Sequence, residues 1–284
     1  MSPLWRDQLR IVLHPDKVVI VRMEKGWRPR VVEKTMLACT PPDAGAAWQG
    51  AVDALIQALA QTMKKDPPRM GIVGTAVVVL SNHFVRYTLA PWSDQLAGAE
   101  EEQQMLARIR FEQTYGNVAK TWDIRMSDDD YGAPRLASAV DPDLLEALRT
   151  AFAATSLRLV SIQPWLMAAY NQWREQMREP DCLLLLSEPG RLCVGQIKNR
   201  QWSQVRIAPI GDNLLEELPA FLEREALVSD LDVSLKKYLF APEQPDLIFP
   251  VTVMPALEIL KLPAQEGFSP YTDAAYGMAL GVEA

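Results

Sequence analysis

Residues 182–208 read CLLLLSEPGRLCVGQIKNRQWSQVRIA and contain three runs with the composition of β-strands. The runs cover residues 182–186, 191–198 and 201–208, and the turn-forming pairs Pro189-Gly190 and Asn199-Arg200 separate them. Short strands that are joined by tight turns pair with their neighbours in antiparallel fashion. This stretch therefore predicts a three-stranded antiparallel meander.

The same order of elements occurs earlier in the chain. Residues 9–14, 17–23 and 30–37 predict a first meander, and the apolar stripe of residues 46–64 predicts an amphipathic helix. Residues 76–80 read AVVVL, which is typical of a strand covered by helices on both faces of a sheet. Leu157 to Ile162 predicts a further strand, and Pro164 predicts the start of another helix.

After the second meander, a helix is expected to begin at an Asp212 cap, with a break or kink at Pro219. A buried strand is expected at residues 247–249 and a short helix at 274–280. The order of elements is thus repeated without a repeat of residues, which predicts two α/β lobes that enclose a cleft.

An insertion is expected in the first half at about residues 83–140. It contains a predicted strand at 84–89, a Glu-rich helix at about 94–115, and strands around 118–126 and 135–140. The predicted domains are therefore a first lobe, 1–180, which carries the insertion, and a shortened second lobe, 181–284.

Composition and charge exclude several classes of protein. The chain has 29 Lys and Arg against 36 Asp and Glu, and the net charge of −7 gives no reason to bind nucleic acid or an anionic bilayer. The sequence has neither a bilayer-length apolar segment nor the apolar core of a signal peptide, so we expect a cytoplasmic protein without direct membrane insertion.

The candidate metal and catalytic residues are few. Three cysteines without chelating spacing are expected to be buried thiols, and Asp128-Asp129-Asp130 lacks the spacing of a calcium loop. The two histidines, His14 and His83, are interpreted as turn residues at strand ends. We therefore expect neither a metal site nor catalytic residues.

Four segments resemble one known family. The resemblance is carried by LSNHFVRY at 80–87, Pro91-Trp92, SIQP at 161–164 and AYGMALG at 275–281. These segments are similar to actin-like proteins of type IV pilus and type II secretion machines, of the PilM, GspL and MshI kinds. The resemblance implies the duplicated RNase H-like fold of the actin, sugar-kinase and heat-shock superfamily, in which two hairpin turns and a glycine-rich loop hold ATP.

The corresponding turns in this chain depart from a nucleotide site. The first turn has Pro15, Asp16 and Lys17 and no glycine, and a proline lacks the N–H that would bind phosphate. The second turn, residues 187–190, has Ser187 and Gly190 but places Glu188 and Pro189 between them. After residue 249 the next glycine is Gly267, so the third loop is also degenerate.

The resemblance then implies a scaffold and pseudo-ATPase that needs no cofactor. Its expected partners are the cytoplasmic tail of an inner-membrane pilus or secretion protein and the motor ATPase of the machine. Trp92 is the candidate partner-binding residue, because it lies next to a proline at the start of the insertion. The alternative is an active ATPase or small-molecule kinase of the same fold, holding ATP and Mg²⁺ through Asp16, Lys17, Ser187 and Gly190.

Overall fold

The computed structural model describes residues 7–24, 29–40, 46–65, 74–92, 100–128 and 132–281, with backbone alone for 62–65. The chain forms two compact units. Unit 1 comprises Met1–Phe84, Pro142–Gln172 and Lys261–Ala284, and unit 2 comprises Val85–Asp141 and Trp173–Leu260. These units are defined by contacts and do not follow the lobe boundaries predicted from the sequence, which stay a prediction.

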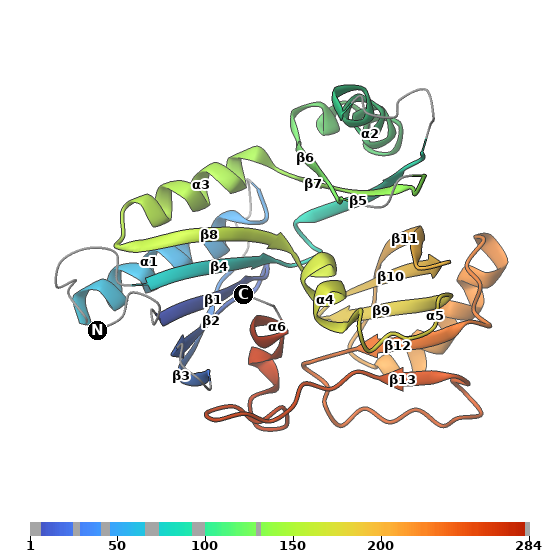
Figure 1. The fold of residues 1–284 in the computed structure, drawn as a ribbon. Helices are drawn as coiled ribbons and strands as arrows, with labels where there is room; N and C mark the ends of the chain where they lie inside the picture. Colours follow the sequence, from blue (N-terminus) through green and yellow to red (C-terminus); the bar gives the residue numbers. More distant parts are fainter. Residues whose placement is uncertain are drawn as a thin grey trace. The chain divides into compact units, whose positions relative to one another are not determined.

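Unit 1 is built on a five-stranded mixed sheet (Figure 1). Its strands are β1 (Asp7–Leu13), β2 (Lys17–Glu24), β3 (Arg30–Ala38), β4 (Gly74–Leu80) and β8 (Leu157–Pro164), in the order β3-β2-β1-β4-β8. The meander β1-β2-β3 is antiparallel, whereas β4 lies parallel to both β1 and β8. The first predicted meander and the buried strand that follows the first helix are confirmed.

Helices cover both faces of this sheet. Helix α1 (Gln49–Lys65) packs on β2 and on α3 (Pro142–Ala153), and α4 (Trp165–Trp173) follows β8. The 3₁₀ helix η3 (Ala274–Tyr276) and α6 (Gly277–Leu280) pack on β1 and β2. Arg10 Nη1 donates to the Leu280 carbonyl at 3.4 Å, which places α6 on the sheet face opposite to the one that Leu9 shares with α1.

We call residues 261–281 the C-terminal strap, because they return to unit 1 after unit 2 and cross its edge strand β3. Lys34 Nζ lies 2.6 Å from Asp273 Oδ1, and the Val31 N–H donates to the Glu266 carbonyl at 2.9 Å. Gly267 has a φ of +80° and lies close to the Val31 carbonyl, which leaves no room for a Cβ atom. The strap is thereby fixed to β3 at both ends of its crossing.

Unit 2 contains a second five-stranded sheet, in the order β11-β10-β9-β12-β13. Its strands are β9 (Cys182–Glu188), β10 (Arg191–Lys198), β11 (Gln201–Pro209), β12 (Lys236–Phe240) and β13 (Leu257–Ile259). Helix α5 (Leu214–Val228) buries Leu214, Leu218 and Leu222 in the core of this unit. The second predicted meander is confirmed.

A three-stranded sheet, β5-β7-β6, also belongs to unit 2. It consists of β5 (Val85–Ala90), β6 (Asp123–Met126) and β7 (Arg135–Val140), and α2 (Glu100–Tyr115) and η2 (Gly116–Thr121) precede β6. Phe111 of α2 is fully buried in a cluster with alanines of β7, and β5 packs against β11. The predicted strand around 118–126 begins at Asp123, because residues 116–121 form the 3₁₀ helix instead.

Three local predictions in unit 2 are wrong. Residues 247–249 form no strand, and Ile248 is 76% exposed, because prolines at 245 and 250 confine the run to a loop. The N-cap of α5 is Asn213 and not Asp212, and no side chain caps this end. The expected break at Pro219 is absent, because the helix continues through this residue in its second turn, while a kink there stays a prediction.

The strand expected at 247–249 is replaced by β12, which contains Lys237. The ammonium of this buried lysine donates to the carbonyls of Leu235 and Pro255, each at 3.2 Å. Burial lowers the pKa of Lys237.

Among the residues that the structure describes, no helix has both the length and the apolar character needed to cross a membrane.

Candidate functional site

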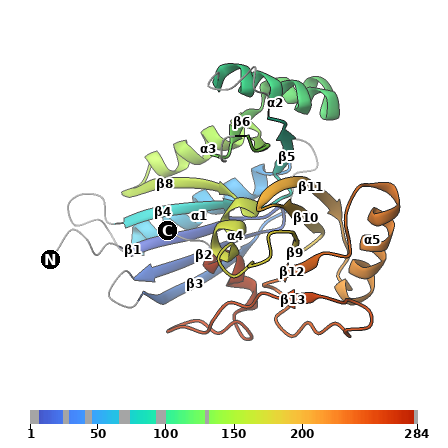
Figure 2. The ribbon, with the colours of Figure 1, turned by 45° about the vertical axis from the view of Figure 1, so that its right-hand side comes forward.

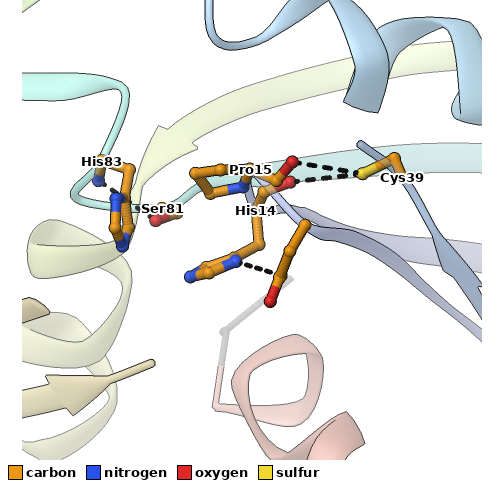
Figure 3. Close-up of polar contacts among 6 residues, drawn as sticks. His14, Pro15, Cys39, Ser81 and His83 are labelled. Carbon is orange, nitrogen blue, oxygen red and sulfur yellow. Dashed lines mark hydrogen bonds and ion pairs between the residues drawn. The ribbon is translucent and has the colours of Figure 1, made fainter. Parts of the chain in front are cut away.

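The carboxyl ends of β1 and β4 bring the two histidines of the chain together. The two strands are parallel neighbours with Leu13 beside Leu80, so the residues that follow them meet at one edge of the sheet. The rings of His14 and His83 contact edge-to-face with centroids 4.8 Å apart (Figure 3). The Ser81 N–H donates to the Leu13 carbonyl at 3.1 Å, which links the two strand ends directly.

The β1–β2 turn holds His14 and Asp16 as a pair. His14 Nδ1 lies 2.5 Å from Asp16 Oδ1, and His14 is buried while the Asp16 side chain is 61% exposed. The Asp16 carboxylate is therefore exposed to solvent while it also binds the ring of the buried His14. Lys17 follows as the first residue of β2, and its carbonyl accepts from the His14 N–H at 3.0 Å.

Cys39 binds this turn from its other side (Figure 3). Its thiol donates to the carbonyls of His14 and Pro15 at 3.7 and 3.5 Å, and its N–H donates to the Asp16 carbonyl at 2.8 Å. Burial, and then the charge of Asp16, raise the pKa of the Cys39 thiol to about 11. The thiol thus stays protonated as a donor and is a poor nucleophile at neutral pH.

These contacts decide what the first turn can bind. A backbone nest for phosphate needs successive N–H groups in right- and left-handed conformation, but neither Pro15 nor Asp16 is among the positive-φ residues of the described chain. Pro15 has no N–H to offer, and the Asp16 carboxylate would repel a phosphate. The turn is therefore suited to bind a cation or an amide N–H group rather than a phosphate.

The second turn follows β9 in unit 2. Gly190 has a φ of +74° after Pro189, as a type II turn requires, and its carbonyl accepts from the Ile210 N–H at 3.4 Å. Ser187 and Glu188 are both buried in the strand. Burial raises the pKa of the neighbouring Cys193 thiol, and the charge of Glu188 raises it further.

The third expected element is a glycine-rich loop after the strand that was predicted at residues 247–249. Since the strand observed in this part of the chain is β12, the loop to inspect is the one that follows β12. The loop after β12 is residues 241–245, which contains Pro242 and Pro245 and no glycine. The glycine-rich loop of a nucleotide site is therefore missing at this position, as it is after residue 249.

The predicted site residues fall into three groups. Asp16 and Lys17 share the β1–β2 turn of unit 1, and Ser187 and Gly190 share the β9–β10 turn of unit 2. Trp92 lies two residues after β5 in unit 2 and is half-buried. Their roles in binding stay predictions.

The contacts of His14, His83 and Cys39 were missed from the sequence. The available signal was that His14 directly follows β1 and His83 lies three residues after β4. A prediction that these two strands are parallel neighbours would have brought the histidines together. Among the described residues, no group of three His, Cys, Asp or Glu side chains is arranged to hold a metal ion.

Comparisons with known proteins bear on the fold. No protein-family model matches the sequence. No curated protein matches it either. The structure of the PilM–PilN type IV pilus biogenesis complex contains a chain that is 16% identical with a TM-score of 0.58, over 97% of each chain.

The cytoplasmic domain of EpsL, an inner-membrane component of the type II secretion system of Vibrio cholerae, is 13% identical. It matches with a TM-score of 0.55 over 98% of this chain and 96% of the EpsL domain. These likenesses cover nearly the whole chain and agree with the repeated order of meander, helix and parallel strand. The chain therefore has the actin-like α/β fold that the PilM and EpsL structures represent.

Proposed function

We propose that this protein is a cytoplasmic, non-catalytic scaffold in the inner-membrane assembly platform of a type IV pilus or type II secretion system. It would bind the cytoplasmic tail of an inner-membrane partner, as the PilM chain is found in complex with PilN. The motor ATPase of the machine is a second expected partner. Support comes from the likeness to PilM and to the EpsL domain over nearly the whole chain.

One observation supports the non-catalytic part of this proposal most directly. In the β1–β2 turn, three successive carbonyls accept hydrogen bonds from Cys39, Pro15 lacks a donor, and Asp16 extends a carboxylate to solvent. An ATP-binding turn needs the opposite arrangement, with N–H groups directed outward and no negative charge among them.

We expect millimolar ATP with Mg²⁺ to leave the melting temperature of the protein unchanged and to give no heat in isothermal titration. A ligand at a hundred times its dissociation constant stabilises a protein by about 2.7 kcal/mol, which a thermal-shift scan detects easily. Pyrophosphate with Mg²⁺ controls for unspecific anion effects. Saturable heat together with a raised melting temperature for ATP would instead favour the alternative, an active ATPase or small-molecule kinase of this fold.

We expect Trp92→Ala to weaken partner binding about tenfold or more, because buried tryptophans dominate the energy of many interfaces. The probes are labelled synthetic peptides with the cytoplasmic tails of inner-membrane proteins encoded beside this chain, measured by fluorescence anisotropy. Trp48→Ala is the matched control, since Trp48 is also half-buried but lies at the start of α1 in unit 1. Tight binding by a normally folded Trp92→Ala protein would remove Trp92 from the interface.

A further inference from the structure

Beyond Val31, the outer edge of strand β3 is open in the part of the chain that the structure describes. It pairs with β2 on its inner side and is the last strand of the unit 1 sheet (Figure 2). On its outer side the described residues contribute one backbone hydrogen bond, from the Val31 N–H to the Glu266 carbonyl of the strap. Residues 34–38 therefore have no backbone partner on this outer side among the residues that the structure describes.

The direction of the backbone groups along β3 follows from one hydrogen bond. The Cys39 N–H donates to the Asp16 carbonyl, so it is directed inward toward the β1–β2 hairpin. The N–H and C=O groups of successive residues alternate between the two sides of a strand. Those of Thr35 and Leu37 are therefore also directed inward toward β2. Those of Lys34, Met36 and Ala38 are directed outward. The outer edge thus offers the N–H and C=O groups of these three residues.

Within the described ranges of the chain, residues 34–38 lack most of the usual protection against strand addition. Natural edge strands carry charges, prolines, bulges or a cover along their length. In β3 the bulge lies at the Val31 end, and the Lys34 ammonium is held by Asp273. Residues 35–38 carry no charge, and the Met36 side chain is 50% exposed.

We propose that β3 pairs antiparallel with β3 of a second copy of the chain, about a two-fold axis at Met36. This inference is independent of the proposed function. The register is the one that pairs the whole open segment, because the strap already occupies the edge at Val31. It places Glu33 opposite the partner's Cys39, Lys34 opposite the partner's Ala38, Thr35 opposite the partner's Leu37, and the two Met36 side chains opposite each other.

The side chains in this register are complementary. No like charges lie opposite each other, whereas an axis at Lys34 would oppose two lysines. The exposed Met36 side chains cover each other across the axis. On the other sheet face, Thr35 and Leu37 line a pocket of about 220 Å³ with Leu9, Ile20 and Ala58, and the partner's Leu37 extends its apolar wall beside Thr35.

The dimer should be reversible. A pair of seven-residue strands buries less surface than the 1,200 Å² or so that stable interfaces reach. We therefore expect dimers at high protein concentration and choose covalent capture as the test.

Met36→Cys in a Cys39→Ser background is expected to form a disulfide-linked dimer under mild oxidation. Directly opposed residues of a hydrogen-bonded antiparallel pair have Cα atoms about 5.5 Å apart, within the range that a disulfide spans. Val32→Cys in the same background is the control, because Val32 is also exposed on β3 but lies opposite the partner's Thr40 and far from the partner's Val32. Non-reducing gels should show cross-linking of Met36→Cys about tenfold faster than of the control.

Charge variants test the same axis without a cysteine. Met36→Lys and Met36→Glu should each lose the concentration-dependent dimer in sedimentation velocity, and an equimolar mixture of the two should recover it. Equal cross-linking of both cysteine variants, or a folded, thiol-reactive Met36→Cys protein that stays monomeric, would overturn the proposal. The open edge would then be left to a strand of another protein.

Discussion

Gly267→Ala is expected to lower the free energy of unfolding by about 3 kcal/mol, because two penalties combine at this residue. Its φ of +80° is costly for any residue with a Cβ. An added Cβ would also lie 2.0 Å from the Val31 carbonyl oxygen, which is backbone and cannot turn aside. The strap would have to move away from β3, and the Val31–Glu266 hydrogen bond would be lost with it.

Urea denaturation followed by circular dichroism measures this loss, and limited proteolysis within 261–281 shows whether the strap has detached. Gly116→Ala is the matched control, since Gly116 has a φ of +74° but no atom within 4 Å of an added Cβ. It should cost about 1 kcal/mol from backbone strain alone. Equal losses for the two variants would mean that the strap is not packed tightly on β3.

Gly195→Ala is expected to destabilise unit 2 by about 2 kcal/mol through overpacking. Gly195 lies in the middle of β10, and the buried Trp202 of β11 folds over it. An added Cβ would lie 2.4 Å from Cζ3 of that indole. The ring cannot move outward without losing its own packing in the core.

A double-mutant cycle isolates this contact. Trp202→Leu alone should destabilise the protein by removing a buried ring, but it also makes room at Gly195. The combined variant should therefore be more stable than the sum of the single losses predicts, by about 1 kcal/mol or more. Simple additivity in urea denaturation would show that the indole does not confine this glycine.

The meanders could be predicted from the sequence because their signals are local. Pro189-Gly190 specifies a type II turn wherever it stands between two strands, and the turn forms as expected. Strand β12 was missed because Lys236 and Lys237 interrupt its apolar pattern. Burial of Lys237 depends on two carbonyls that the fold brings to its ammonium, one of them 18 residues away at Pro255.

The contacts of the site depend on strand order, which no local pattern encodes. His14 and His83 were both placed correctly at strand ends, yet they meet because β4 inserts beside β1 in parallel register. Cys39 reaches the same turn because β3 returns alongside β2. The residue types at Pro15 and Asp16, in contrast, can be read from the sequence alone, and the loss of ATP binding that they imply stays a prediction.

The strap has a consequence for synthesis of the protein on the ribosome. The five strands of the unit 1 sheet, of which β8 is the last to be translated, emerge long before residues 261–281, and all of residues 173–260 of unit 2 are translated in between. During that interval the nascent sheet exposes the face and the edge of β3 that Asp273 and Glu266 later bind. Until residues 261–281 are translated, neighbouring nascent chains on one polysome can therefore pair along the edge of β3, including the Val31 end that the strap later occupies.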